Sequence, residues 1–205
     1  MLRVGLTGGV ASGKSTVGQM LAAHGAHFLQ ADSLAHRLYE PGEPVYHAVV
    51  ERFGRGILNC DGTINRARLA NAAFPDRIAE LNAIVHPAVV EAQNQWMSDC
   101  ERSDPNGIAV VEAALLVEAD AVKDFDKLIV VTCSAEEKIA HYAKRAKMPL
   151  DQAAAEVARR SAAQLSDEGK AARADYVIHN SGALADVARQ VAMIWADLQG
   201  LPAPS

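Results

Sequence analysis

The sequence predicts an α/β fold in which a parallel sheet of five strands carries helices on both faces. Five short apolar segments lie far apart in the 205-residue chain, and they hardly alternate between apolar and polar residues. Such segments are typical of strands that are buried on both faces. Stretches with helical spacing separate them, as the crossover connections between parallel strands require. A glycine-rich turn follows the first segment, at the end of the strand where such sheets bind ligands.

The predicted strands are short, and glycines or polar residues follow most of them. They span residues 3–7, 27–31, 108–112, 128–132 and 176–179. The first is followed by a helix over residues 15–24, which Gly25 ends.

Residues from about 38 to 102 are too many for one crossover connection, and they predict a helical insert. Pro44 is expected to open one helix, and Asn65 is the expected cap of a second. A third helix is expected over residues 78–96, interrupted at His86-Pro87 because proline breaks helical hydrogen bonding.

A basic region lies between Lys138 and Arg173. Eight basic and four acidic side chains give it a local excess of +4, in a chain of net charge −5. Ser134 starts its first helix with a capping box, and Pro149 marks the start of its second. A basic helical pair beside a phosphate site predicts a lid. The expected division is a nucleotide-binding core (1–37, 103–135 and 174–205), an insert (38–102) and a lid (136–173).

The composition excludes several classes of protein. The chain is 50% hydrophobic and 22% charged, so it is neither disordered nor fibrous, and its acidic balance argues against nucleic-acid or membrane-surface binding. Its three cysteines form no CxxC pair, which predicts neither a zinc site nor a disulfide framework. No apolar run has the length of a membrane span, and no signal peptide is recognisable. We expect a monomer in the cytoplasm.

The sharpest functional signal is Gly8-Gly-Val-Ala-Ser-Gly-Lys-Ser15, which matches G-x-x-x-x-G-K-[ST] at every fixed position. It follows a strand and opens a helix, as a phosphate-binding loop must. Lys14 is expected to bridge the β- and γ-phosphates of ATP, and Ser15 to supply an oxygen ligand to Mg²⁺. The loop residues predicted to bind the nucleotide are Gly9, Ala11, Ser12, Gly13, Lys14, Ser15 and Thr16. The alternative is a glycine-rich helix cap with an exposed lysine.

Further motifs narrow the class of nucleotide-binding protein. No N-K-x-D motif is present, which argues against a switch GTPase, and the D-x-x-G at 104–107 precedes a strand and is interpreted as a turn. Glu112 ends the third predicted strand. Its carboxylate could hold Mg²⁺ through water, or it could be a solvated strand end.

A small-molecule kinase also needs groups that handle the acceptor and the moving phosphoryl. Asp32 follows the second strand and could accept or orient a hydroxyl proton, although it could also cap a helix from Ser33. Arg145, Arg159 and Arg160 lie in the basic region. Any of them could stabilise the phosphoryl group, or could simply face solvent.

A set of further segments runs through nearly the whole chain in a fixed order. They are Leu6 to Thr16, Ala31-Asp32, Glu40-Pro41-Gly42, Phe53-Gly54, Asp61-Gly62, Arg66 with Leu69, Phe74, His86-Pro87, Leu115 to Glu118, Arg160 with Gln164, Ala174 to Ile178, and Asn180-Ser181-Gly182. In this order they resemble the dephospho-CoA kinase family, the last enzymes of coenzyme A synthesis. The resemblance implies a P-loop fold and transfer of the γ-phosphoryl of ATP to the ribose 3′-hydroxyl of dephospho-CoA.

The resemblance also implies roles for individual residues. Asp32 would be the base, while Lys14 and Arg145 would stabilise the phosphoryl group. Asn180 and Gly182 would lie near the adenine of ATP. The residues implied to shape the acceptor site are Arg66, His86, Leu115, Leu116 and Arg160. His86 precedes a proline, so a structural role is an alternative for it.

Four positions depart from the family pattern. Gln30 stands where the first Asp of a D-A-D segment is usual, and Ala114 replaces the proline of P-L-L. His141 stands where an arginine is common, and His179 replaces the aspartate before Asn180.

Two other functions are compatible with the phosphate-binding loop. One is a kinase of similar architecture for a nucleoside, a nucleotide or another metabolite. The other is a regulator that hydrolyses or senses ATP, which would need no acceptor carboxylate.

Overall fold

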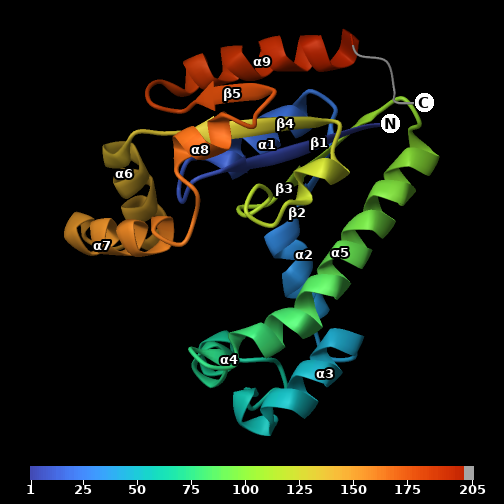
Figure 1. The fold of residues 1–205 in the computed structure, drawn as a ribbon, viewed down its shortest axis with the longest axis vertical. Helices are drawn as coiled ribbons and strands as arrows, with labels where there is room; N and C mark the ends of the chain where they lie inside the picture. Colours follow the sequence, from blue (N-terminus) through green and yellow to red (C-terminus); the bar gives the residue numbers. More distant parts are fainter. Residues whose placement is uncertain (201–205) are drawn as a thin grey trace. The chain divides into compact units, whose positions relative to one another are not determined.

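The computed structural model describes residues 1–200, which form two compact units (Figure 1). The first unit comprises residues 1–30 and the chain from residue 100 onward, and the second comprises residues 31–99. Each unit has an apolar core of its own.

The first unit is built on a sheet of five parallel strands in the order β2-β3-β1-β4-β5. These are β1 (Leu2–Gly8), β2 (His27–Gln30), β3 (Ile108–Glu112), β4 (Lys127–Thr132) and β5 (Tyr176–His179). β1 lies at the centre and pairs with β3 on one side and β4 on the other. The predicted parallel sheet is confirmed, and only the end of the second strand differs, because Ala31 already belongs to a helix.

Both faces of the sheet are buried, which explains why the strands read as continuous apolar runs. Along β4, Ile129 and Val131 face a core shared with the helices α1 (Lys14–Ala23) and α9 (Leu184–Gly200). Leu128 and Val130 face the other side, where they pack with Leu116 from the segment that follows β3. Figure 1 shows α9 running along the sheet. A short 3-10 helix, η2 (Ala121–Asp124), also lies in this segment.

Three helices between β4 and β5 form the region predicted as a lid. They are α6 (Ala135–Ala146), α7 (Leu150–Ser161) and α8 (Asp167–Ala171). The predicted capping box is only half formed: the Ser134 side chain accepts a hydrogen bond from the Glu137 backbone N–H, but the Ser134 backbone N–H donates to Ser181 Oγ and not to the Glu137 side chain. α6 and α7 are amphipathic and pack together through Tyr142 and Val157, in a cluster that also contains Val10 of the phosphate loop.

The second unit consists of helices and one isolated antiparallel bridge between Leu58 and Ile64. It contains α2 (Ala31–Leu38), α3 (Pro44–Phe53), the 3-10 helix η1 (Arg55–Ile57), α4 (Arg66–Ala73) and most of α5 (Ile78–Ser103). Their shared core centres on Val45, Val49, Ile57 and Leu69. Pro44 stands in the first turn of α3, and the Asn65 side chain accepts from the Arg68 N–H, so both predicted helix starts are confirmed.

The predicted interruption of the third helix is wrong. α5 continues through Pro87 as one helix of 26 residues. Proline removes a backbone donor at a cost of about 3 kcal/mol or more in an isolated helix. Leu81, Ile84 and Val85 precede it and pack against the core of the second unit, and this packing favours the helix despite the lost bond.

Within residues 1–200, no helix combines the length and apolar character that crossing a membrane requires.

The cap of α4 gives a test of the second unit's stability. Replacing Asn65 by alanine leaves the Arg68 N–H without its acceptor and removes a second bond from Asn65 Nδ2 to Asn59 Oδ1. We expect Asn65→Ala to lower the free energy of unfolding by about 1 kcal/mol, measured by urea denaturation. Asn71→Ala, an exposed position inside the same helix, should be neutral or slightly stabilising. Equal effects of the two substitutions would contradict the capping role.

Candidate active site

The loop between β1 and α1 depends on glycine. Gly13 has a φ of 93°, and a Cβ there would lie 2.1 Å from Nδ2 of Asn180. A Cβ at Gly8 would lie 2.2 Å from the carbonyl oxygen of Val131 on β4. Ala11 is also left-handed, with a φ of 56°. Left-handed residues that alternate with other backbone conformations direct successive backbone N–H groups into one concavity. This is the geometry that binds a phosphate.

Lys14 lies over this loop. Its ammonium donates to the carbonyl oxygens of Gly8 at 3.1 Å and Gly9 at 2.8 Å. Because it is held by the loop itself at the start of α1, the charge lies where phosphates would meet the helix N-terminus. Lys14 is therefore part-buried and held by the loop, unlike the exposed lysine of the alternative, and its role as a phosphate ligand stays a prediction.

Ser15 and Glu112 meet beside the loop. The Ser15 hydroxyl donates to Oε1 of Glu112 at 2.9 Å, and the Gln30 amide donates to Oε2 of the same carboxylate at 2.9 Å. Glu112 is therefore part-buried and bonded at both oxygens, so its interpretation as a solvated strand end is wrong. A hydroxyl and a carboxylate together form the all-oxygen donor set that Mg²⁺ prefers.

Asn180 joins the carboxyl end of β5 to the loop. Its Nδ2 donates to the Ser12 carbonyl oxygen at 2.8 Å, and its backbone N–H donates to Thr132 at the end of β4. Gly182 follows with a φ of 146°. Of the two residues predicted to lie near the base of the nucleotide, Asn180 therefore contacts the phosphate loop, and Gly182 follows it two positions later.

The lid region contacts the loop through α6 and α8. Lys138 and Asp167 form an ion pair at 2.6 Å, with side chains only 14% and 16% exposed. A Cβ on Gly9 would lie 2.6 Å from the Asp167 carboxylate, so this pair rests directly on the loop backbone. His141 adds a hydrogen bond from Nδ1 to the Ala11 carbonyl oxygen at 3.1 Å.

The lid arginines gather around one aromatic ring. The guanidinium carbons of Arg145 and Arg160 lie 5.3 Å and 5.4 Å from the centre of the Tyr142 ring. Arg159 instead makes two hydrogen bonds to Glu156, which lower the pKa of that carboxyl. Arg145 makes no ion pair within residues 1–200. Of the three arginines it is therefore the one whose charge is not balanced by a carboxylate, while Arg159 belongs to a solvated helix face.

The segment after β3 is tied to the base of the lid by a buried lysine. Lys170 is fully buried, and its ammonium donates to Glu118 Oε1 at 3.0 Å and to the Ala114 carbonyl at 2.9 Å. Burial by itself would raise the pKa of Glu118, but the Lys170 bond and two backbone bonds bring it below the usual value. Leu116 is buried against the sheet, whereas Leu115 is 48% exposed. Of this predicted pair, only Leu115 is therefore presented to a ligand in this conformation.

The other predicted acceptor residues belong to the second unit. Asp32 is exposed in the first turn of α2, and because that helix includes Ala31, the interpretation of Asp32 as its cap is wrong. Arg66 is exposed at the start of α4, where it contacts His36. His86 is exposed on α5 and lines a shallow hollow with Val90 and neighbouring residues of the same helix.

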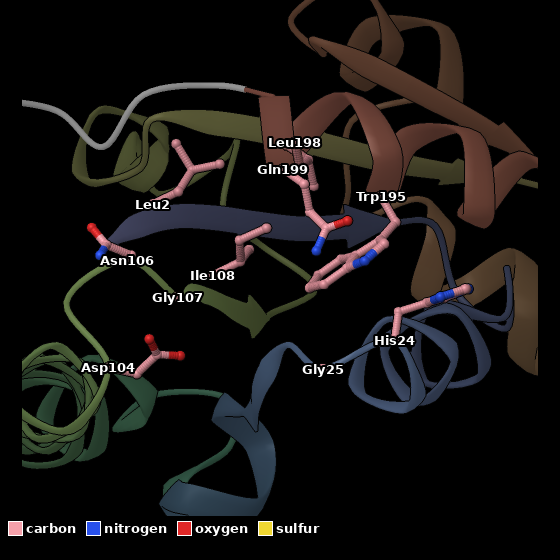
Figure 2. A pocket seen from close by; sticks show the side chains of 10 residues that line it. All are labelled: Leu2, His24, Gly25, Asp104, Asn106, Gly107, Ile108, Trp195, Leu198 and Gln199. Carbon is pink, nitrogen blue, oxygen red and sulfur yellow. The ribbon is translucent and has the colours of Figure 1, made fainter.

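A hollow of about 530 Å³ lies at the opposite end of the sheet, and Figure 2 shows the side chains that line it. They include Leu2 and Ile108, at the starts of β1 and β3, His24, which directly follows α1, and Trp195 from α9. The two rings are stacked, with their centres 6.0 Å apart. Ligands of parallel α/β sheets bind at the carboxyl ends of the strands, where the phosphate loop lies, so this hollow is not part of that site.

Comparison with known proteins agrees with this geometry. A family model described as dephospho-CoA kinase matches residues 2–186. The chain belongs to the dephospho-CoA kinase family. It is 39% identical over 201 residues to a dephospho-CoA kinase of Thermobifida fusca, with 97% of each chain covered. The family expected from the sequence is thereby confirmed.

Two solved structures have the same fold as this kinase-family chain. A crystal structure of TT1252 from Thermus thermophilus matches with a TM-score of 0.78 and 30% identity, covering 96% of this chain and 97% of the other. A dephospho-CoA kinase from Campylobacter jejuni matches with a TM-score of 0.69 and 22% identity, with 97% of each chain covered. The expected P-loop fold is confirmed.

Some residues of this kinase-family site were not singled out from the sequence. Lys138 and Asp167 are 29 positions apart, and Lys170 and Glu118 are 52 apart, so no local spacing signals either pair. His36 could have been found, because it lies four residues after Asp32 on a predicted helix.

The close approach at Gly13 predicts the effect of one methyl group. Gly13→Ala must displace Asn180 and adopt an unfavourable φ, so we expect ATP affinity to fall at least about tenfold, or about 1.4 kcal/mol. Isothermal titration calorimetry would measure this. Gly56→Ala is the matched control, since a Cβ there meets nothing within 4 Å. Unchanged ATP affinity in Gly13→Ala would contradict the proposed loop geometry.

Lys170 gives a test of the buried ion pair. Lys170→Met leaves Glu118 buried without its cation, and we expect a loss of about 3–5 kcal/mol in the free energy of unfolding. Adding Glu118→Leu should restore much of it. Because the folded pKa of Glu118 is lowered, the wild-type advantage is full above its ordinary value of 4.5 and disappears as the pH falls through the folded pKa.

Urea denaturation at pH 7 and at acid pH would measure both effects. Lys123→Met, which breaks an exposed pair with Asp120, should cost at most about 1 kcal/mol. A single Lys170 variant as stable as the Lys123 control would contradict this account.

Proposed function

We propose that this member of the dephospho-CoA kinase family transfers the γ-phosphoryl of ATP to the ribose 3′-hydroxyl of dephospho-CoA, giving coenzyme A in the last step of its synthesis. The observation that carries the proposal is the phosphate loop with Ser15 bonded to Glu112, in a chain that matches the family over residues 2–186. A loop that only sensed ATP would not need the family's acceptor residues.

The nucleotide would be held at the carboxyl edge of the sheet. Backbone N–H groups from Gly9 to Thr16 would surround its phosphates, with Ser12 and Gly13 at the centre of the turn. Asn180, which contacts the loop, and Gly182, two positions later, would border the adenine.

Mg²⁺ suits the oxygen donors at this edge. Ser15 would coordinate it directly and Glu112 through water, since the two groups already lie 2.9 Å apart. When bound, the ion neutralises charge on the β- and γ-phosphates.

In the chemical step, the acceptor 3′-oxygen bonds to the γ-phosphorus as the bond from that phosphorus to the ADP oxygen breaks. Asp32 accepts or orients the proton that the 3′-hydroxyl loses. Lys14 stabilises the β- and γ-phosphate oxygens. Arg145, whose charge has no carboxylate partner within residues 1–200, follows the oxygens of the transferred group.

We assign five residues to the acceptor: Arg66, His86, Leu115, Leu116 and Arg160. Arg66 and His86 belong to the insert, residues 38–102, Leu115 and Leu116 belong to the segment after β3, and Arg160 belongs to the lid, residues 136–173. Leu116 would act from behind, by supporting the exposed Leu115. We propose that the lid closes during turnover and that the enzyme works as a monomer in the cytoplasm.

The direct test measures ADP release from Mg·ATP with and without dephospho-CoA, with the mass of the product checked. Release that depends on dephospho-CoA, with one phosphate added, supports the proposal. Release that is indifferent to dephospho-CoA would indicate an ATPase. Phosphorylation of a nucleoside, with no response to dephospho-CoA, would assign the chain another acceptor.

Asp32 has a specific expected effect. Asp32→Asn keeps the size of the side chain but removes the proton acceptor, so kcat should fall by about 10²–10⁴-fold while ATP affinity stays unchanged. Stopped-time assays and calorimetry would measure the two quantities. Asp76→Asn, an exposed aspartate elsewhere in the second unit, should leave both unchanged. Normal turnover by Asp32→Asn would remove Asp32 from the mechanism.

A further inference from the structure

His36 and Arg66 form an unusual pair of basic side chains in the second unit. Nη1 of Arg66, at the start of α4, lies 2.5 Å from Nε2 of His36 on α2. A guanidinium can only donate, so Nε2 accepts and the imidazole proton lies on Nδ1.

The pair has no anionic partner of its own. Within residues 1–200, neither His36 nor Arg66 contacts a carboxylate, whereas Arg52 and Arg77 of the same unit both bind Glu80. Both side chains of the pair are exposed. Arg66 keeps further N–H donors beyond the one directed at His36, and the imidazole keeps its Nδ1–H. The pair therefore offers a set of donors suited to an anion that arrives from solution.

A third polar group borders the pair. Tyr39 is part-buried near the end of α2, and burial raises the pKa of its phenol, while the nearby charge of Arg66 opposes that rise. The charge of Arg66 therefore reaches the phenol, although no hydrogen bond joins the two side chains within residues 1–200.

The spacing between the His36–Arg66 pair and Asp32 suits a ribose phosphate. Asp32 and His36 are four residues apart on α2, so both lie on one face of the helix, about 6 Å apart along its axis. A ribose ring separates its 3′-hydroxyl from its 5′-phosphate by a comparable span. With the 3′-hydroxyl at Asp32, a 5′-phosphate on the same ribose falls beside His36 and Arg66.

We propose that His36 and Arg66 bind the 5′-diphosphate of the acceptor, one helical turn from Asp32. This inference rests on the proposed function and adds to it a diphosphate subsite. The spacing of His36 and Asp32 on α2 then positions the acceptor. A ribose whose 5′-phosphate is held at His36 presents its 3′-hydroxyl to the Asp32 carboxylate. The pair would select acceptors by their 5′-substituent and fix which hydroxyl reacts.

The test compares acceptors with and without a 5′-diphosphate. Arg66→Gln should raise the KM for dephospho-CoA at least about tenfold and His36→Ala about threefold or more, since both remove donors to a phosphate. In both variants, kcat and the KM for ATP should stay within about twofold of wild type. Turnover of adenosine, which has no 5′-phosphate, should be the same in the variants as in the wild-type protein. The matched control is Arg37→Gln, the next residue on α2, about 100° around the helix and exposed, which should leave every constant unchanged.

An independent readout follows the His36 imidazole by nuclear magnetic resonance, with its signal assigned from its loss in His36→Ala. Dephospho-CoA and inorganic pyrophosphate should both shift this signal in the wild-type protein, whereas adenosine should not. Circular dichroism and urea midpoints would show that both variants fold.

Three results would overturn the inference. One is a KM for dephospho-CoA within twofold of wild type in both variants, and another is an equal loss with adenosine. The third is a His36 signal that pyrophosphate leaves unmoved. Failure of the wild-type protein to phosphorylate dephospho-CoA would instead overturn the proposed function. In that case a pyrophosphate shift at His36 would still support an anion site, and its absence would remove that as well.

Discussion

The parallel register of the sheet is the constraint on which the phosphate site depends. Glu112 is paired with Leu6 of β1 on one side and with Gln30 of β2 on the other, while Gly8 is paired with Val131 of β4. All strands run the same way, so their last residues reach one edge together. A slip of one residue would turn Glu112 to the other face of the sheet and separate it from both Ser15 and Gln30.

The lid region rests on this edge through two kinds of contact. Val10 shares an apolar cluster with Tyr142 and Val157, and the Lys138–Asp167 pair lies against the backbone of Gly9. The apolar contact is tolerant of sliding, but a part-buried ion pair holds its geometry only while both partners stay matched. An incoming triphosphate brings negative charge to the same place. The Lys138 ammonium, now paired with Asp167, therefore lies beside the place that the phosphates would take.

The features of this fold that could be predicted from the sequence depend on residues that are close together in the chain. The phosphate loop is one continuous motif, and the caps at Asn65 and Ser134 each depend on residues three positions away. The strands could be recognised because both faces of the sheet are covered. Pro87 could not be interpreted correctly, because the packing that keeps α5 intact comes from other helices. The partners of Lys170 lie more than fifty positions away in the chain, and no single sequence indicates which carboxylate a buried lysine selects.

Gln30 stands where the family pattern has an aspartate, and its hydrogen bond to Glu112 gives a physical explanation for this difference. Where the family usually carries an aspartate, this chain carries an amide that donates to Glu112 at 2.9 Å. An aspartate in the same place would set two carboxylates side by side, and their negative charges would repel. The amide instead gives Glu112 a neutral hydrogen-bond donor in place of a second negative charge. Gln30 therefore belongs to the hydrogen-bonded edge beside the phosphate loop, where Glu112 also accepts from Ser15.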